Sequence, residues 1–579
     1  MKVKLAKTAG FCMGVRRAME IAFSEAKKDN GSLFTYGPLI HNQQVLDLLK
    51  SKGVSVKKSI QSNDRGRIII RAHGVTPEEK GVIKASHLKL IDATCPKVLK
   101  VQAIIKKHYD EGYTPIIFGD ANHPEVTGLM GYAGGNGIVI NSTDEIEERL
   151  KKVRSKNFVV VSQTTQDVDS YSKFISEIKN LFPDSVTFNT ICDETYKRQG
   201  EVKSLASEVD SMVIVGGKNS GNTKRLYEIS KSTGKPAFQI ETEKELNKTW
   251  FSSTKTVGVT AGASTPNWMI TRVIERLKTM GESRRSVLDN LTGKAFRFLM
   301  KISIPESIGA FSLTYASLEL SMGKAPIVYP CLAMLYIYSM HVLNRFLDKE
   351  ASKYNDPGIS AFYIRHRAPL IATAIAGVFL GLFLSLSLGI YQALVFLALS
   401  VLGLTYNIPI IPWRSGYLKR YTKIKDLPGS KTLVEAIAWG TISVLLPFIG
   451  EPKPSIPAIV ISFIFVFSLC YVRLGLFDVL NIQGDSIVGK ETLPIALGEE
   501  RTMKLLFFLN GSFTAVLMAA TLVGIISGLG YPLLLCFIMN FFYLTAYYKK
   551  WIRDVHDLRA LAETNFLFAG LLTVIWKLI

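Results

Sequence analysis

Three cysteines in the first half of the chain are the residues best suited to chemistry. Cys12, Cys95 and Cys192 lie far apart in the sequence, each in a polar, turn-like segment, and none has a second cysteine close by. Thiolates are the usual ligands of iron–sulfur clusters. Three thiolates would leave one metal ion of such a cluster without a protein ligand. Zinc is the alternative, although structural zinc sites normally use close cysteine pairs. A metal ion with a free coordination position would allow redox chemistry on a bound substrate.

Three histidines and a glycine-rich loop indicate an anion site beside that metal centre. His41, His73 and His123 lie in the polar segments PLIHNQQV, RAHGV and ANHPEV. The loop GGKNSGNT at 216–223 follows a strand-like run and opens a helical pattern, where backbone N–H groups and the helix N-terminus favour phosphate or diphosphate. Glu125, two residues after His123, is a candidate proton donor.

Short strand-like runs throughout the first half end in small or polar residues. Helical patterns separate most of these runs, which is the β–α alternation of parallel sheets. In such sheets ligands gather outside the carboxyl ends of the strands. The sequence therefore predicts one composite site from the polar residues that follow the strands: His73, Cys95, Thr164, Thr165, Cys192, Ser220 and Ser264.

The second half of the 579-residue chain has the composition of a membrane domain. Residues 1–280 have the mixed pattern of a soluble α/β domain, and 281–302 form a charged linker expected to lie along the membrane surface. Long apolar runs recur over 303–579, which predicts an all-α, multispanning membrane domain with about nine transmembrane helices. The expected spans are 303–321, 326–343, 369–388, 390–407, 432–449, 457–477, 503–529, 531–548 and 562–579.

The distribution of basic residues explains the net charge of the chain and predicts the orientation of the second half in the membrane. The formal net charge is +21, but no helix-turn-helix, zinc-finger or aromatic RNA-binding signature accompanies it, so nucleic acid is not expected as a partner. Lysines and arginines crowd alternate loops of the second half, which suits the positive-inside rule and anionic lipids. No apolar core of a cleavable signal peptide opens the chain. We therefore expect a multi-pass protein of the inner (plasma) membrane, with its soluble domain in the cytoplasm and its C-terminus outside.

The same basic loops carry acidic residues suited to a metal ion. Asn344 and Asp348 lie one helical turn apart, and Asp478, Asn481 and Asp485 follow near the end of the sixth expected span. Carboxylates at the cytoplasmic ends of membrane helices are suited to bind Mg²⁺, which in turn binds a diphosphate.

Residues 1–280 resemble the LytB-type 4-hydroxy-3-methylbut-2-enyl diphosphate reductases, which end the methylerythritol phosphate route to isoprenoids. The resemblance runs in order through FCMGVRRA, HN, AHGV, DATCP, HPEV, SQTT, TIC…RQ, GGKNSGNT and TAGAS. It implies a pseudo-threefold α/β fold around a 4Fe–4S cluster on Cys12, Cys95 and Cys192, with the substrate hydroxyl at the unligated iron. It further implies that Glu125 delivers a proton and Thr164 positions that hydroxyl. The implied diphosphate ligands are His41, His73, His123, Ser220, Gly221, Asn222 and Ser264.

The resemblance also implies a reaction. Two electrons, from a donor such as ferredoxin or flavodoxin, and two protons would replace an allylic hydroxyl with hydrogen and release water. Hydroxide is a poor leaving group, so iron would act as a Lewis acid and Glu125 as a general acid. Protonation at either end of the allyl unit would yield isopentenyl and dimethylallyl diphosphate. Gly221 stands where the family commonly has serine, and we expect weaker diphosphate contact there.

Residues 297–579 look like a UbiA-type intramembrane prenyltransferase, which attaches a polyprenyl chain to an acceptor. The motif around Asp478, with TLPIALG behind it, and the segment YTKIKDLPGSK at 421–431 carry this resemblance. Ser352 stands where the family usually has an aspartate, and Asn481 where it often has one. Fewer carboxylates should weaken the binding of Mg²⁺.

Three hypotheses of different classes follow. The first is a membrane-tethered fusion of an isoprenoid reductase and a polyprenyl transferase. The second keeps the reductase but makes the membrane half a catalytically inactive anchor. The third is a transporter that carries an iron–sulfur sensor.

Overall fold

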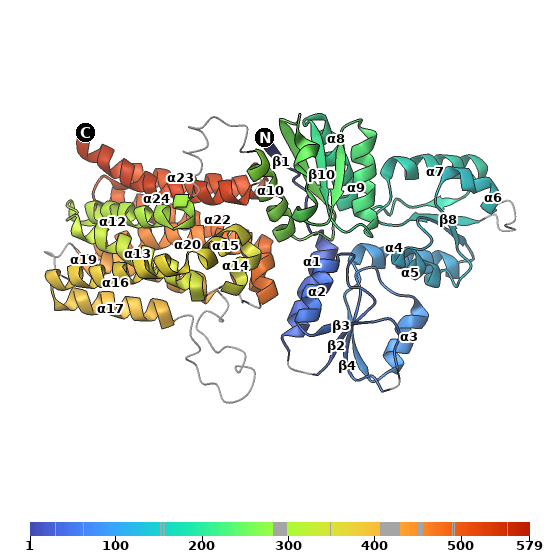
Figure 1. The fold of residues 1–579 in the computed structure, drawn as a ribbon, viewed down its shortest axis with the longest axis horizontal. Helices are drawn as coiled ribbons and strands as arrows, with labels where there is room; N and C mark the ends of the chain where they lie inside the picture. Colours follow the sequence, from blue (N-terminus) through green and yellow to red (C-terminus); the bar gives the residue numbers. More distant parts are fainter. Residues whose placement is uncertain are drawn as a thin grey trace. The chain divides into compact units, whose positions relative to one another are not determined.

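The computed structural model divides the chain into two compact units, Met1–Arg284 and Arg285–Ile579. Its elements are drawn in Figure 1. The residues it describes are 1–28, 31–61, 63–150, 153, 157–281, 298–347, 349–405, 429–449, 455–488, 490, 492–552 and 554–579.

The first unit contains three four-stranded sheets, and every strand pair in them is parallel. The strands are β1 Lys2–Leu5, β2 Leu33–Tyr36, β3 Val54–Lys57, β4 Gly66–Ile70, β5 Leu88–Asp92, β6 Thr114–Phe118, β7 Ile138–Ile140, β8 Phe158–Ser162, β9 Val186–Thr187, β10 Ser211–Val215, β11 Ala237–Ile240 and β12 Thr256–Ala261. The main helices are α1 Met13–Ala26, α2 Gln43–Ser51, α3 Pro77–Ala85, α4 Pro96–Asp110, α5 Pro124–Tyr132, α6 Ile146–Leu150, α7 Val168–Leu181, α8 Asp193–Ser207, α9 Gly221–Ser232 and α10 Asn267–Gly281.

The three sheets repeat one strand order. They run β3-β2-β4-β5, β7-β6-β8-β9 and β11-β10-β12-β1. The first strand of the chain therefore takes the fourth place in the sheet of the last three strands, and the unit closes on itself in three similar lobes. Figure 1 shows these lobes in blue, teal and green. This order confirms the expected α/β class and supplies the threefold repeat that the family resemblance implied.

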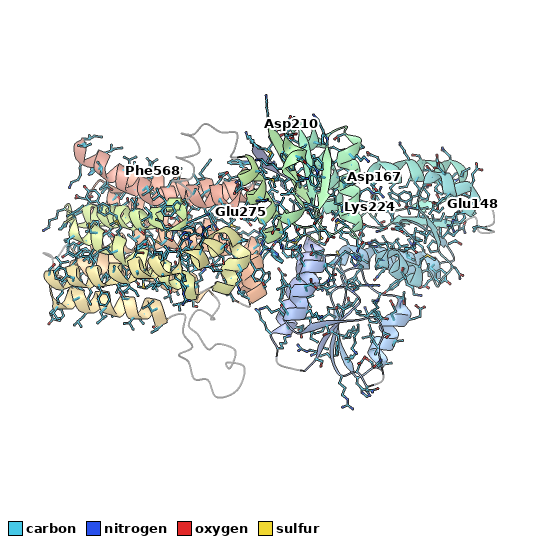
Figure 2. The ribbon with its side chains drawn as sticks, viewed as in Figure 1. Glu148, Asp167, Asp210, Lys224, Glu275 and Phe568 are labelled. Atoms are coloured by element: carbon cyan, nitrogen blue, oxygen red, sulfur yellow. The ribbon has the colours of Figure 1, made fainter. Side chains whose placement is uncertain are left out.

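Buried apolar side chains explain why the central strands form. All five residues of β8 and all five of β10 are buried, as expected for parallel strands with helices on both faces. Asp210, which precedes β10 and is labelled in Figure 2, accepts hydrogen bonds from the backbone N–H groups of Lys255 (2.9 Å) and Thr256 (2.8 Å). This carboxylate holds the start of β12 beside β10.

The described residues of the second unit form helices and the turns between them. Its helices are α12 Ile304–Met322, α13 Val328–Leu347, α14 Lys349–Asn355, α15 Pro357–Arg365, α16 Arg367–Leu388, α17 Ile390–Thr405, α18 Ser430–Gly440, α19 Leu446–Phe448, α20 Ile456–Val488, α21 Leu493–Leu497, α22 Glu499–Leu522, α23 Gly530–Tyr548 and α24 Val555–Leu578. A short π-helical stretch, Thr441–Leu445, joins α18 to α19.

Six helices of the described residues are long and apolar enough to cross a membrane. They are Arg367–Leu388, Ser430–Phe448, Ile456–Val488, Glu499–Leu522, Gly530–Tyr548 and Val555–Leu578. The other three predicted spans correspond to α12, α13 and α17, which fall outside that set. Exposed apolar side chains on α16, including Phe379 and Phe383, suit a surface that faces lipid. The second unit thus has the character of an integral membrane domain.

Candidate active sites

The three cysteines occupy one equivalent position in the three lobes. Each is the N-cap of the helix that follows the fourth strand of its sheet: Cys12 precedes α1 after β1, Cys95 precedes α4 after β5, and Cys192 precedes α8 after β9. The backbone of each cysteine is extended, which is usual for an N-cap. The threefold repeat therefore turns three distant sequence positions toward one centre.

The three thiols interact with one another. Burial raises the pKa of the Cys12 thiol and of the Cys95 thiol, and negative charge on Cys192 raises both further. Gly14 brings α1 onto Cys95, because a Cβ atom at Gly14 would lie 2.5 Å from the Cys95 Sγ atom. In the described part of the chain, the sets of ligand atoms that lie within 4.8 Å of one another do not include these three sulfurs. Thiolates that approach one another without converging on a single point fit a multi-metal cluster better than a single zinc ion.

The three histidines converge next to one another. The ring centroids are 4.7 Å apart for His41 and His73, 5.7 Å for His41 and His123, and 5.4 Å for His73 and His123. Burial lowers the pKa of all three rings, to about 4 for His123. Within the described residues, the buried ring nitrogens His41 Nε2 and His73 Nδ1 have no hydrogen-bond partner. Buried polar atoms are rarely left in this state, so these nitrogens indicate a polar ligand.

The third lobe contributes further groups to the histidine cluster. Ser220 is the N-cap of α9, and the Asn222 Nδ2 atom behind it is buried and has no hydrogen-bond partner among the described residues. The Ser264 hydroxyl donates to the His41 carbonyl at 3.2 Å. A Cβ atom at Gly221 would lie 3.8 Å from the His123 ring, an ordinary contact distance, so there is room for a larger residue here. These donors around the imidazoles form a polar cluster suited to a phosphate group.

Glu125 and Thr164 form a buried pair between the histidines and the cysteines. The Glu125 carboxylate is 1% exposed and accepts hydrogen bonds from the Thr164 backbone N–H (2.7 Å) and hydroxyl (2.9 Å). Burial raises the pKa of Glu125 to about 7, although both hydrogen bonds favour the ionised form. The Thr164 carbonyl in turn accepts from the Cys192 N–H at 3.0 Å. Thr164 therefore links the turn at Cys192 to a carboxyl group that can hold a proton near neutral pH.

In the second unit, two buried aspartates lie on one face of α20. Asp478 and Asp485 are seven residues apart, and each is 1% exposed. Asp478 accepts from the Thr432 hydroxyl at 2.5 Å and the Lys431 ammonium at 3.2 Å. Asp485 accepts from the Asn355 amide at 3.0 Å, and its Oδ2 atom has no hydrogen-bond partner among the described residues. The free oxygen is a potential cation ligand.

Asn481, which lies between these aspartates in the sequence, already has a hydrogen-bond partner within the protein. Its side-chain oxygen accepts from Arg559 at 2.5 Å, and Arg559 also donates to Asp356 at 3.2 Å. Asn344 lies on α13, whereas Asp348 lies outside the described residues. The structure therefore brings Asp478 and Asp485 to one face, whereas the first predicted acidic motif lies only in part within the described residues.

Comparisons with known proteins give a match for each unit. The LytB protein family model matches residues 3–278, and the UbiA prenyltransferase family model matches residues 308–571. A 4-hydroxy-3-methylbut-2-enyl diphosphate reductase of Geobacter sulfurreducens is 44% identical over 285 residues, which are 49% of this chain and the whole of that relative.

The chain belongs to the LytB family. It continues into residues 308–571, which match the UbiA prenyltransferase family model, so the reductase-like unit is only the first half. Among solved structures, an (E)-4-hydroxy-3-methyl-but-2-enyl diphosphate reductase is 42% identical, covers 48% of this chain and all of its own, and has a TM-score of 0.38. A UbiA homologue of Archaeoglobus fulgidus bound to GPP and Mg²⁺ is 15% identical over 48% of this chain and 99% of its own, with a TM-score of 0.35.

Two arginines in the LytB unit have a place near the site that sequence reasoning did not single out. Positive charge on Arg71 contributes to the lowered pKa of His41, His73 and His123, so it lies beside the histidine cluster. Arg198 is buried behind Cys12 and Cys192. The available signals were the short segments RAHGV and KRQ, which place each arginine close to a predicted site residue.

Proposed function

We propose that the LytB unit, residues 1–280, reduces 4-hydroxy-3-methylbut-2-enyl diphosphate to isopentenyl and dimethylallyl diphosphate. The observation that carries this proposal is the placing of Cys12, Cys95 and Cys192 at equivalent helix N-caps of three lobes. In this proposal 281–302 is a linker and 303–579 spans the membrane about nine times. The reductase then lies on the cytoplasmic side of the inner membrane.

The donor set fits a 4Fe–4S cluster held by the three cysteines. Such a cluster, when bound, supplies the electrons and an iron that polarises the substrate hydroxyl. Its electrons come from a carrier protein such as ferredoxin or flavodoxin.

The other residues of the pocket bind the substrate and move protons. The diphosphate is held by His41, His73 and His123 from two lobes and by groups at the start of α9 from the third. A doubly charged anion favours protonated imidazoles, so binding raises the low pKa values of these rings. Thr164 orients the substrate hydroxyl, and Glu125 gives the proton with which it leaves as water. Two electrons and a second proton complete the products, and the end of the allyl unit that takes this proton decides which isomer forms.

The direct test is turnover by the full chain. Protein purified anaerobically in detergent is supplied with the hydroxylated diphosphate and a reduced viologen dye, and both five-carbon diphosphates are quantified. We expect substrate consumption that depends on the reductant and is absent after the cluster has been removed by chelation. Cluster-loaded protein that consumes no substrate would contradict the proposal.

The pKa of Glu125 predicts a falling pH profile. A general acid must be protonated, and burial sets the pKa of this carboxyl to about 7, so the competent fraction falls as pH rises through 7. We expect kcat to decline by about tenfold per pH unit well above that pKa. Measurement of kcat between pH 6 and 9 with the dye as donor checks this. A profile that stays flat over this range would remove Glu125 from the role of proton donor.

For the UbiA unit we propose a Mg²⁺-dependent polyprenyl transferase that acts on a prenyl diphosphate. Two buried aspartates on one helix face, with a free oxygen on Asp485 and with Lys431 close to Asp478, support metal and diphosphate binding. The second candidate, an inactive anchor for the reductase, is favoured by the internal hydrogen bonds that already occupy Asn481 and Asp478. In both cases membrane lipid surrounds the helices.

Asp478→Asn separates these two candidates. If the unit is a transferase, loss of this carboxylate should lower Mg²⁺-dependent transfer of a radiolabelled prenyl group by about a hundredfold or more. Glu500→Gln, at an exposed carboxylate paired with Lys504, is the matched control and should retain transfer. If wild-type protein shows no metal-dependent product, the anchor is favoured.

A further inference from the structure

Arg198 is a buried arginine of the first unit whose polar contacts are with backbone carbonyls. It is 2% exposed, and its guanidinium donates to two backbone carbonyls, those of Ala261 (2.7 Å) and Gly10 (3.0 Å). Within the described residues, no carboxylate forms an ion pair with it at 4.0 Å or less. Arg67, the comparable buried arginine of this unit, has Glu25 at 2.8 Å. A buried charge without a counter-charge is costly, which requires an explanation.

The nearest acidic residues do not supply that counter-charge. Glu194 and Glu201 act on Arg198 only at longer range. The Glu201 carboxylate is engaged elsewhere, because it accepts from the Thr8 N–H at 2.8 Å and the Thr8 hydroxyl at 2.7 Å.

The position of Arg198 points to the cysteines instead. It lies in the second turn of α8, and long side chains on a helix lean toward its N-terminus, here Cys192. One of its carbonyl partners, Gly10, is two residues before Cys12. Burial lowers the pKa of the guanidinium, and negative charge on Cys12 is the main influence that opposes this shift.

We propose that Arg198 is the buried counter-charge of the iron–sulfur cluster and that it raises the reduction potential of that cluster. This inference rests on the cluster site proposed above. Three thiolates outweigh the positive charge of an oxidised 4Fe–4S core, so the ligated cluster is an anion, and an added electron makes it more negative. A fixed positive charge in a buried site stabilises the reduced form more than the oxidised form. Arg198 is thus a positioning and tuning residue that does not itself touch the substrate.

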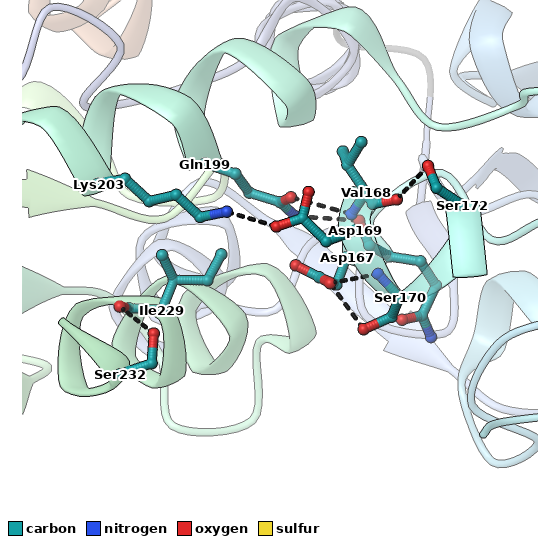
Figure 3. Close-up of polar contacts among 10 residues, drawn as sticks. Asp167, Val168, Asp169, Ser170, Ser172, Gln199, Lys203, Ile229 and Ser232 are labelled. Carbon is teal, nitrogen blue, oxygen red and sulfur yellow. Dashed lines mark hydrogen bonds and ion pairs between the residues drawn. The ribbon is translucent and has the colours of Figure 1, made fainter. Parts of the chain in front are cut away.

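The alternative is that Arg198 has a purely structural role. Other side chains of α8 also hold neighbouring segments in place. The Gln199 side chain accepts from the Val168 N–H at 3.3 Å and donates to the Gln166 carbonyl at 2.9 Å. Figure 3 shows this contact beside the ion pair of Lys203 and Asp169, which joins α8 to the start of α7. A structural role predicts altered stability without an altered potential.

The experiment is an anaerobic redox titration of the full-length, cluster-loaded protein. Reduction is followed by visible absorbance and electron paramagnetic resonance in the wild type, Arg198→Lys, Arg198→Gln and Arg67→Gln. We expect the midpoint of Arg198→Gln to fall by at least 59 mV, which is a tenfold less favourable one-electron reduction. Arg198→Lys keeps the charge and should shift by less than half as much, and Arg67→Gln should not shift. Equal midpoints in all four proteins would overturn the proposal.

A second measurement applies if Arg198→Gln does not retain the cluster. In apo-protein the buried charge has no counter-charge among the described residues, and relief of that cost should offset part of the loss of its two hydrogen bonds to backbone carbonyls. Thermal unfolding of the apo-proteins should therefore show a smaller loss for Arg198→Gln than for Arg67→Gln, which breaks an existing ion pair. An equal or larger loss would make Arg198 structural and overturn the proposal. Wild-type protein that binds no cluster would instead contradict the proposed function on which this inference depends.

Discussion

Cys95→Ser should abolish both cluster binding and reductase activity. The Cys95 sulfur is at the N-cap of α4, in contact range of Gly14 on α1, so no neighbouring thiol can replace it without moving a helix. A serine hydroxyl is nearly isosteric but remains protonated at neutral pH, and it is a poor ligand for iron. Iron and sulfide content, visible absorbance and dye-driven turnover of the purified protein measure the effect. We expect all of them to fall to background.

The matched control is Cys331→Ser, at a cysteine on α13 of the second unit. It should retain the iron content and turnover of the wild type. Full iron content in Cys95→Ser would mean that the three N-cap cysteines do not hold the cluster.

Glu125→Gln should lower kcat by about 10²–10⁴-fold, the usual contribution of a positioned general acid. The substitution keeps the shape of the side chain, and its amide oxygen can still accept from the Thr164 N–H. It removes the transferable proton and puts an NH2 group in place of the oxygen that accepts from the Thr164 hydroxyl. Steady-state kinetics with a reduced dye should therefore show the loss in kcat, with little change in KM, because the carboxyl group does not hold the diphosphate.

Glu208→Gln provides the control for a lost carboxylate. The exposed Glu208 carboxylate pairs with Lys4 at 2.8 Å just after the last residue of α8, at the opposite end of that helix from Cys192. It should leave kcat unchanged. A Glu125→Gln enzyme within about threefold of the wild-type kcat would show that the proton comes from another group.

The reductase half was predictable because its site lies at strand ends. The predicted runs that end in His73, Cys95, Thr164, Ser220 and Ser264 all became parallel strands or the turns after them, because buried β-rich runs between helical patterns have few other folds available. The comparisons confirm the family resemblance of both halves. The three parallel sheets confirm the α/β class of the first half. The roles of the individual site residues stay predictions.

Pairing partners and burial were not predictable in the same way. The sequence does not reveal that β1 joins the sheet of β10–β12, because strand pairing over such a separation depends on the whole unit. Arg198 appears in the sequence as one more basic residue among sixty-nine lysines and arginines, and only the fold shows that it is buried.

In the second unit, the sequence patterns did not single out Asn355, which contacts a predicted site residue. The contact of Asn355 with Asp485 joins the end of α14 to α20, yet an Asn-Asp pair in a sequence is typical of an ordinary turn. The fold is needed to show that this turn faces the aspartates of α20.

The pairing of β1 with β12 has a consequence for how the protein is made. Lys2 is in register with Thr256, so β1 is synthesised about 250 residues before the strand with which it pairs. Contacts of such separation form late in folding. The turn that carries Cys12 follows β1, so it cannot reach its final position until β12 has been translated. In the proposed function, the cluster would then load after synthesis of the whole first unit, while the apolar helices emerge.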